Sequence, residues 1–100
     1  MAIKINILIV DDHPFIIEGY KNAINGYNKK GNYEFIITQA KDCKTGYEAI
    51  TKQGIEPFGV AFFDLSMPVY EEKGIFSGED LASLIKTTMP DCKIILLTMH

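Results

Sequence analysis

The sequence is poor in several features that would point to particular classes of protein. It contains no tryptophan, only two cysteines among 100 residues, and fewer basic than acidic side chains, 10 against 13. A net charge of −3 argues against a nucleic-acid-binding surface on this segment, because affinity for the phosphate backbone depends on lysine and arginine. Cys43 and Cys92 lack metal-ligand spacing, and we expect both thiols to be reduced and unpaired.

Long hydrophobic runs are also absent. No apolar stretch approaches the roughly 20 residues that a membrane-spanning helix requires. The first ten residues have neither the charged start and long apolar segment nor the small-residue cleavage site of a secretory signal. We therefore expect a cytoplasmic protein without a membrane segment, built as one small domain because 100 residues allow only a modest core.

Short apolar runs alternate along the chain with segments of helical periodicity. The runs rich in β-branched and aromatic side chains predict four strands, over residues 3–10, 33–40, 58–63 and 93–98. Helices are expected to begin near Pro14, which suits the first helical position, and near Thr45 and Ser77, which start capping patterns. The inner face of the first helix would contain Ile16, Tyr20, Ala23, Ile24 and Tyr27.

This alternation predicts an α/β domain in which a parallel sheet is covered by helices on both faces, because strand–helix–strand connections are right-handed. The polar stretch between Pro68 and Ser77 has no hydrophobic period, and we expect it to be an exposed loop.

Acidic residues follow two of the predicted strands. Asp11 and Asp12 come directly after the first strand, and Asp64 comes at the carboxyl end of the third, directly after Phe63. If the second and third strands lie on opposite sides of the first, the strand order reverses between the first and third, and ligands of open parallel sheets bind at such a switch point. We therefore expect these three carboxylates to meet at one edge of the sheet.

Three carboxylates at one edge repel one another unless a cation lies among them. Mg²⁺ prefers oxygen ligands and takes only one or two carboxylates with water and phosphate, which leaves Asp64 available as a nucleophile toward a phosphoryl group. Thr98, at the end of the fourth strand, could hydrogen-bond a phosphoryl oxygen. One of the acid pair could also cap the first helix, and we interpret His13 as a loop or helix-cap residue in preference to a metal ligand.

Together these motifs resemble the receiver domain of two-component response regulators. The resemblance rests on Asp11-Asp12, Asp64-Leu-Ser-Met-Pro68 and Leu97-Thr98, in the order and spacing of that family. It implies a flavodoxin-like doubly wound parallel sheet. The tetrapeptides Asp-Asp-His-Pro and Leu-Thr-Met-His further resemble the subfamily whose receivers carry a C-terminal helix-turn-helix DNA-binding domain.

The resemblance also implies roles for individual residues. Asp64 would be the phosphoacceptor, Asp11, Asp12, Asp64 and the backbone carbonyl of Ser66 would hold Mg²⁺, and Thr98 would be the switch hydroxyl. The phosphoryl donor would be a sensor histidine kinase, and DNA would be contacted only through an output domain. The domain would then be a signalling phosphoacceptor and no enzyme in the usual sense.

Two departures from the family pattern are visible. About six extra residues, centred on residues 70–76, separate Pro68 from Gly78. The family also continues with a helix, a strand that ends in a lysine, and a last helix, so we expect residues 1–100 to be the N-terminal portion of a receiver. The fourth strand would then be an uncovered sheet edge, which predicts a homodimer or higher oligomer.

Two other functions remain open from the sequence. A Mg²⁺-dependent phosphohydrolase with an aspartate nucleophile usually has a second acid two residues further on, where this chain has Ser66. A receiver-like domain that binds partners without being phosphorylated is the other alternative, and it would be favoured if Mg²⁺ does not bind.

Overall fold

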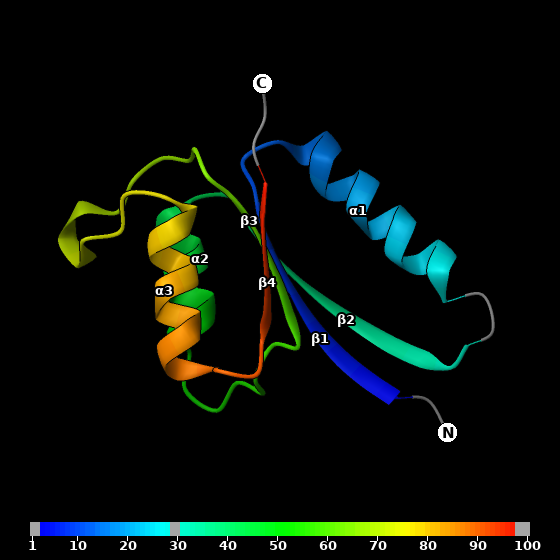
Figure 1. Cartoon of the computed structure of the whole chain (residues 1–100). Coiled ribbons are helices and arrows are strands. Elements are labelled where there is room, and N and C mark those ends of the chain that lie inside the picture. The colour runs from blue at the N-terminus through cyan, green and yellow to red at the C-terminus, as the bar shows by residue number, and fades with distance from the viewer. Residues whose placement is uncertain (1–2, 29–30, 98–100) are drawn as a thin grey trace.

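The computed structural model describes residues 3–28 and 31–97. Its centre is a sheet of four parallel strands in the order β2-β1-β3-β4 (Figure 1). The strands are β1 (Ile3–Val10), β2 (Tyr33–Ala40), β3 (Val60–Asp64) and β4 (Lys93–Leu97). Because β2 and β3 lie on opposite sides of β1, the expected reversal of strand order between β1 and β3 is confirmed.

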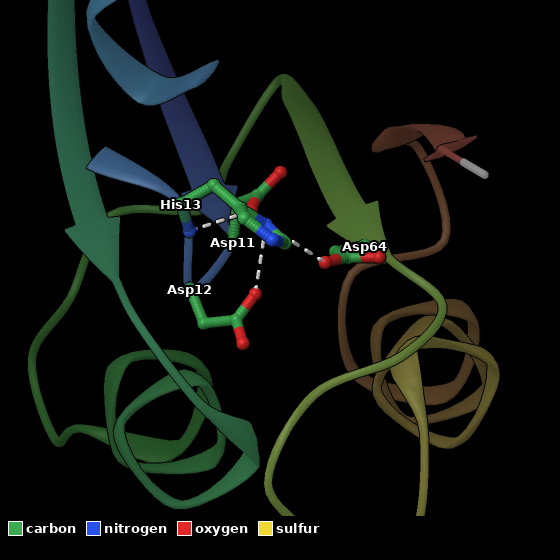
Figure 2. A group of neighbouring side chains, drawn as sticks. All are labelled: Asp11, Asp12, His13 and Asp64. Carbon is green, nitrogen blue, oxygen red and sulfur yellow. Dashed lines mark hydrogen bonds and ion pairs between the residues drawn. The ribbon is translucent and has the colours of Figure 1, made fainter. Parts of the chain in front are cut away.

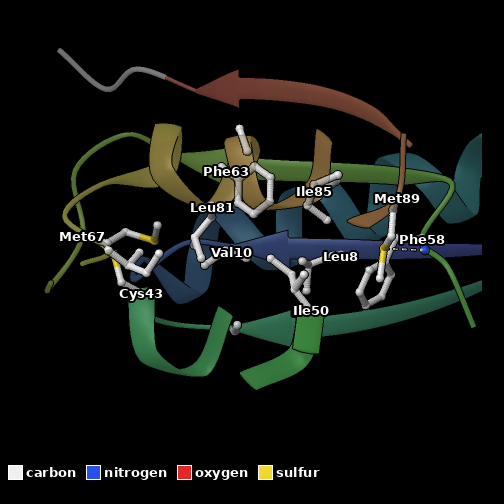
Figure 3. Packing of buried hydrophobic residues seen from close by; sticks show 14 residues of the cluster. Leu8, Val10, Cys43, Ile50, Phe58, Phe63, Met67, Leu81, Ile85 and Met89 are labelled. Carbon is white, nitrogen blue, oxygen red and sulfur yellow. Dashed lines mark hydrogen bonds between the residues drawn. The ribbon is translucent and has the colours of Figure 1, made fainter. Parts of the chain in front are cut away.

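The helices lie on both faces of the sheet, as in a doubly wound α/β fold. Helix α1 (Pro14–Tyr27) covers one face, and α2 (Cys43–Thr51) and α3 (Gly78–Thr88) cover the other (Figure 1). Strand side chains alternate between these layers. Leu8 and Val10 pack with α2 and α3 in the larger core, and Ile7 and Ile9 pack beneath α1. The larger core includes Phe63, Leu81 and Ile85 (Figure 3).

Helix α2 begins earlier than the sequence predicted. Asp42, and not Thr45, is the N-cap residue, and its Oδ1 accepts a hydrogen bond from the Thr45 N–H at 2.8 Å. The Thr45 hydroxyl in turn accepts from the Asp42 N–H at 3.2 Å, which completes a reciprocal capping box. The predicted start at Thr45 is wrong because the Asp42 carboxylate satisfies the free N–H groups one turn earlier.

Helix α1 begins at Pro14 as predicted, but its inner face is shifted. Ile17 is the buried residue, and Tyr20 and Ile24 continue the contact with the sheet. The Tyr20 ring stacks on Phe62 with 5.2 Å between ring centroids. Tyr27, which we expected on the inner face, is 81% exposed in the last helical turn.

The segment between Pro68 and Ser77 is more ordered than the predicted loop. It contains a turn of 3₁₀ helix, η1 (Glu71–Lys73), and Tyr70 and Ile75 exchange backbone hydrogen bonds of 2.7 and 3.1 Å. Ile75 is buried in the larger core. Gly74 closes the turn with φ of 68°, a left-handed conformation that suits glycine. The expectation of a wholly exposed loop is therefore wrong.

None of the helices within residues 3–28 and 31–97 is long and apolar enough to cross a bilayer. Cys43 is buried and Cys92 is partly buried, and both are free thiols.

Candidate functional site

The acids that the sequence singled out meet at the C-terminal edge of the sheet (Figure 2). Asp11 directly follows β1, and Asp64 is the last residue of β3. Since β1 and β3 are adjacent and parallel, their C-terminal ends deliver both carboxylates to the same point. One side-chain ligand atom from each of Asp11, Asp12, His13 and Asp64 lies within 4.8 Å of the others.

Burial separates the three carboxylates into two kinds. Asp11 and Asp64 are the buried charged residues of the described chain, with exposed fractions of 1% and 2%. Asp12 is open to solvent. The site therefore has a desolvated floor made of two acids and an acid at its rim.

Each buried acid has one satisfied and one unsatisfied oxygen. Asp64 Oδ1 accepts a hydrogen bond from the Ser66 N–H at 3.1 Å, and Asp11 Oδ1 accepts from the His13 N–H at 2.8 Å. Asp11 Oδ2 and Asp64 Oδ2 are buried without a hydrogen-bond partner among the described residues. Buried oxygens of this kind are costly unless a cation or donor reaches them, and hard oxygen ligands suit Mg²⁺. The donor set thus fits a magnesium ion.

The electrostatics of Asp64 reflect this crowding. Burial raises the pKa of Asp64 above its usual value, and the nearby charges of Asp11 and Asp12 raise it further. The Ser66 N–H opposes the shift because it stabilises the charged carboxylate. A positive charge in the cluster would favour the ionised form, which is the form that can act as a nucleophile.

His13 was interpreted from the sequence as a loop or helix-cap residue. It is indeed the N-cap residue of α1, but its side chain makes no capping hydrogen bond. Its Nδ1 lies 2.8 Å from Asp11 Oδ1, 2.9 Å from Asp12 Oδ1 and 3.7 Å from Asp64 Oδ2 (Figure 2). The hydrogen bond with Asp11, more than any other contact, raises the pKa of His13. The signal in the sequence was the position of His13 between an acid pair and a helix-starting proline.

The remaining predicted site residues have different outcomes. Ser66 contacts Asp64 through its backbone N–H, and the role of its carbonyl stays a prediction. Thr98 lies outside the described residues, so its role also stays a prediction. Leu97, the residue before it, pairs with Asp64 in the register of β3 and β4.

Sequence reasoning missed one close neighbour of the site. Gly78, the first residue of α3, is buried against the backbone of Asp64. A Cβ atom at this position would lie 2.2 Å from the Asp64 carbonyl oxygen. The contact joins residues 14 positions apart, so no local pattern could have shown it.

Comparison with known proteins agrees with this arrangement. The family model described as the response regulator receiver domain matches residues 7–100. The transcriptional regulatory protein MctR of Rhizobium johnstonii is 27% identical over 97 residues, which cover 97% of this chain and 39% of MctR. The chain therefore spans well under half the length of this relative.

Solved structures of response regulators show the same fold. RcsB from Salmonella enterica serovar Typhimurium, bound to promoter rprA in the presence of phosphomimetic BeF₃⁻, is 26% identical with a TM-score of 0.68. The match covers 96% of this chain and 70% of RcsB. The MaeR response regulator bound to beryllium trifluoride is 18% identical with a TM-score of 0.68, over 96% of this chain and 68% of MaeR, and this likeness concerns the fold alone.

The family match spans almost the whole chain. The chain also has the parallel sheet and an acid cluster that fits a phosphorylation site. The chain therefore belongs to the response regulator receiver domain family, the phosphoacceptor domains of two-component signalling.

Proposed function

We propose that Asp64 is the phosphoacceptor and receives a phosphoryl group from the phosphohistidine of a sensor histidine kinase. The observation that carries this proposal is the buried Asp64 carboxylate, which ends β3 beside Asp11 and Asp12 and keeps one oxygen free of hydrogen bonds among the described residues. An acid on the surface of a helix would have neither this burial nor these partners.

The transfer makes one bond and breaks one. A carboxylate oxygen of Asp64 bonds to phosphorus while the P–N bond of the donor phosphohistidine breaks, and the bonding electrons and a proton stay on the donor imidazole. The Ser66 N–H holds Asp64 Oδ1 and so fixes the orientation of the carboxylate. Bound Mg²⁺, held by Asp11, Asp12, Asp64 and the Ser66 carbonyl, would supply positive charge next to the transferring group.

The proposal also covers the kind of protein to which this domain belongs. The relative MctR is named a transcriptional regulatory protein, and the RcsB structure contains promoter DNA. We therefore place this receiver in a cytoplasmic transcriptional regulator that contacts DNA only through an output domain. Phosphorylation would add negative charge at Asp64, and Thr98 would respond as the switch hydroxyl.

A phosphohydrolase is less well supported. Its usual second acid would stand at position 66, where this chain has the exposed Ser66, whose contact with Asp64 is through the backbone. We therefore propose a phosphoacceptor that does not turn over small phosphate esters.

We also propose that chains associate through β4. This strand pairs only with β3 in the described sheet, and its Ile95 and Leu96 are exposed. Apolar residues on an outer strand favour pairing with a second chain.

The phosphoacceptor assignment is tested by the intact mass of the protein after incubation with Mg²⁺ and acetyl phosphate. We expect the parent chain to gain one phosphoryl group and Asp64→Asn to gain none. Asp42→Asn is the matched control, because it replaces a carboxylate outside the cluster and should be labelled like the parent. Equal labelling of Asp64→Asn would overturn the assignment, and an unlabelled parent would favour an interaction domain that is not phosphorylated.

A further inference from the structure

The proposed phosphoacceptor chemistry uses no atom of the His13 side chain, yet this side chain lies among the carboxylates of the site. Its Nδ1 is within 2.9 Å of an oxygen of Asp11 and of Asp12, and 3.7 Å from an oxygen of Asp64 (Figure 2). The ring nitrogen therefore lies where side-chain oxygens of the three acids converge.

A metal ion held by these acids would need the space among their side-chain oxygens. Mg²⁺ demands oxygen ligands in near-octahedral geometry and draws charge from the carboxylates it binds. Asp11 Oδ1 already accepts from the His13 N–H at 2.8 Å and from Nδ1 at 2.8 Å, and Asp12 Oδ1 lies 2.9 Å from Nδ1. The imidazole ring therefore lies in the space that an ion held by Asp11, Asp12 and Asp64 would need.

We propose that the His13 side chain has to leave the space among Asp11, Asp12 and Asp64 when Mg²⁺ binds, so that His13 lowers the affinity of the site for the ion. This inference rests on the proposed function of the cluster as a magnesium-dependent phosphorylation site. It assigns to His13 an effect on the Mg²⁺ concentration that the receiver needs before it can be phosphorylated.

The surroundings of His13 allow this movement. The His13 carbonyl accepts hydrogen bonds from the N–H groups of Ile16 and Ile17, at 3.0 and 3.2 Å, so the backbone is fixed as the N-cap of α1. The side chain is 47% exposed to solvent. Rotation about the side-chain bonds can move the ring outward without a change in the helix.

The test measures Mg²⁺ affinity by isothermal titration calorimetry of the parent chain, His13→Ala and His13→Asn. Asn is a good N-cap residue, so the second variant keeps the test valid if the first one folds poorly. We expect both variants to bind Mg²⁺ roughly two- to fivefold more tightly, the range of a partly exposed ion pair. Lys21→Ala, which removes a positive charge of α1 that pairs with Glu18, is the matched control and should leave the affinity unchanged.

A second readout follows the ring itself. In a nuclear magnetic resonance titration, the imidazole signals that are lost in His13→Ala should shift in the parent over the Mg²⁺ range in which the ion binds. Unchanged affinity in both variants, or weaker binding that would make His13 a ligand, overturns the inference while the phosphoacceptor role stands. If the parent neither binds Mg²⁺ nor becomes phosphorylated, the proposed function falls together with the inference.

Discussion

At the scale of single residues, Gly78 shows how tightly the site is bound to the fold. A Cβ atom there would lie 2.2 Å from the Asp64 carbonyl oxygen and 3.0 Å from Phe63 Cβ. The nearest atom belongs to the backbone, so it cannot rotate away as the end of a side chain can. The absence of a side chain at Gly78 therefore helps to fix the end of β3 that bears the phosphoacceptor.

We predict that Gly78→Ala destabilises the protein by about 1–3 kcal/mol, the usual effect of overpacking a buried position. The substitution should also slow phosphorylation by acetyl phosphate, because the Asp64 backbone has to shift. Urea unfolding and the rate of mass gain measure the two effects.

The control for this substitution is Gly19→Ala in α1. A Cβ at Gly19 meets no atom within 4 Å, so replacement should stabilise the helix by up to about 1 kcal/mol and leave the phosphorylation rate unchanged. If Gly78→Ala unfolds at the same urea concentration as the parent, the steric argument is wrong.

At the scale of elements, the start of α2 depends on Asp42. The N–H of Thr45 lowers the pKa of Asp42 below its usual value, with further lowering from the Thr45 hydroxyl and the charges of Lys41 and Lys44. Because the pKa is lower in the folded than in the unfolded chain, the ionised carboxylate stabilises the fold above its ordinary pKa of 3.8. This stabilisation is lost as the pH falls through the folded pKa.

We predict that Asp42→Ala lowers the free energy of unfolding by about 1 kcal/mol at neutral pH, the typical loss of an N-cap. The difference from the parent should narrow as the pH falls below 3.8, because the parent then loses the charged cap as well. Urea unfolding across this range of pH tests both statements.

Asp42→Asn serves as the control, since it keeps a capping oxygen but does not titrate. It should lie between Asp42→Ala and the parent in stability at neutral pH and lose no capping free energy in acid. A gap between Asp42→Ala and the parent that stays constant down to acid pH would contradict the role of the Asp42 charge.

The helices and strands also show how much of the fold could be predicted from the sequence. Strands β1 and β2 have the predicted bounds, residues 3–10 and 33–40. Long runs of β-branched residues next to turn residues strongly favour strands. The start of α2 was ambiguous, since Asp42 and Thr45 are both good caps and only the folded hydrogen bonds decide. The burial of Ile75 and the contact of Gly78 with Asp64 depend on residues distant in the chain, so local pattern could not show them.

At the scale of the whole molecule, the two faces of the sheet are covered unequally. Helices α2 and α3 enclose the larger core, but within residues 3–28 and 31–97 α1 is the one helix on the other face (Figure 1). There an open, almost wholly apolar hollow of about 590 Å³ is lined by residues of α1 and of all four strands, including Tyr20, Ile24, Phe62 and Ile95. This hollow reaches β4, the outer strand of the described sheet.

We predict that this 100-residue chain forms dimers or higher oligomers, because exposed apolar residues on an outer strand favour association. Ile95 and Leu96 of β4 are 41% and 45% exposed. Ile95→Lys places a charge on that strand and should shift the protein toward the monomer, whereas Thr87→Lys on the exposed side of α3 should not. Light scattering over a concentration series measures the mass, and a monodisperse monomer of the parent would show that the apolar surface of β4 does not drive assembly.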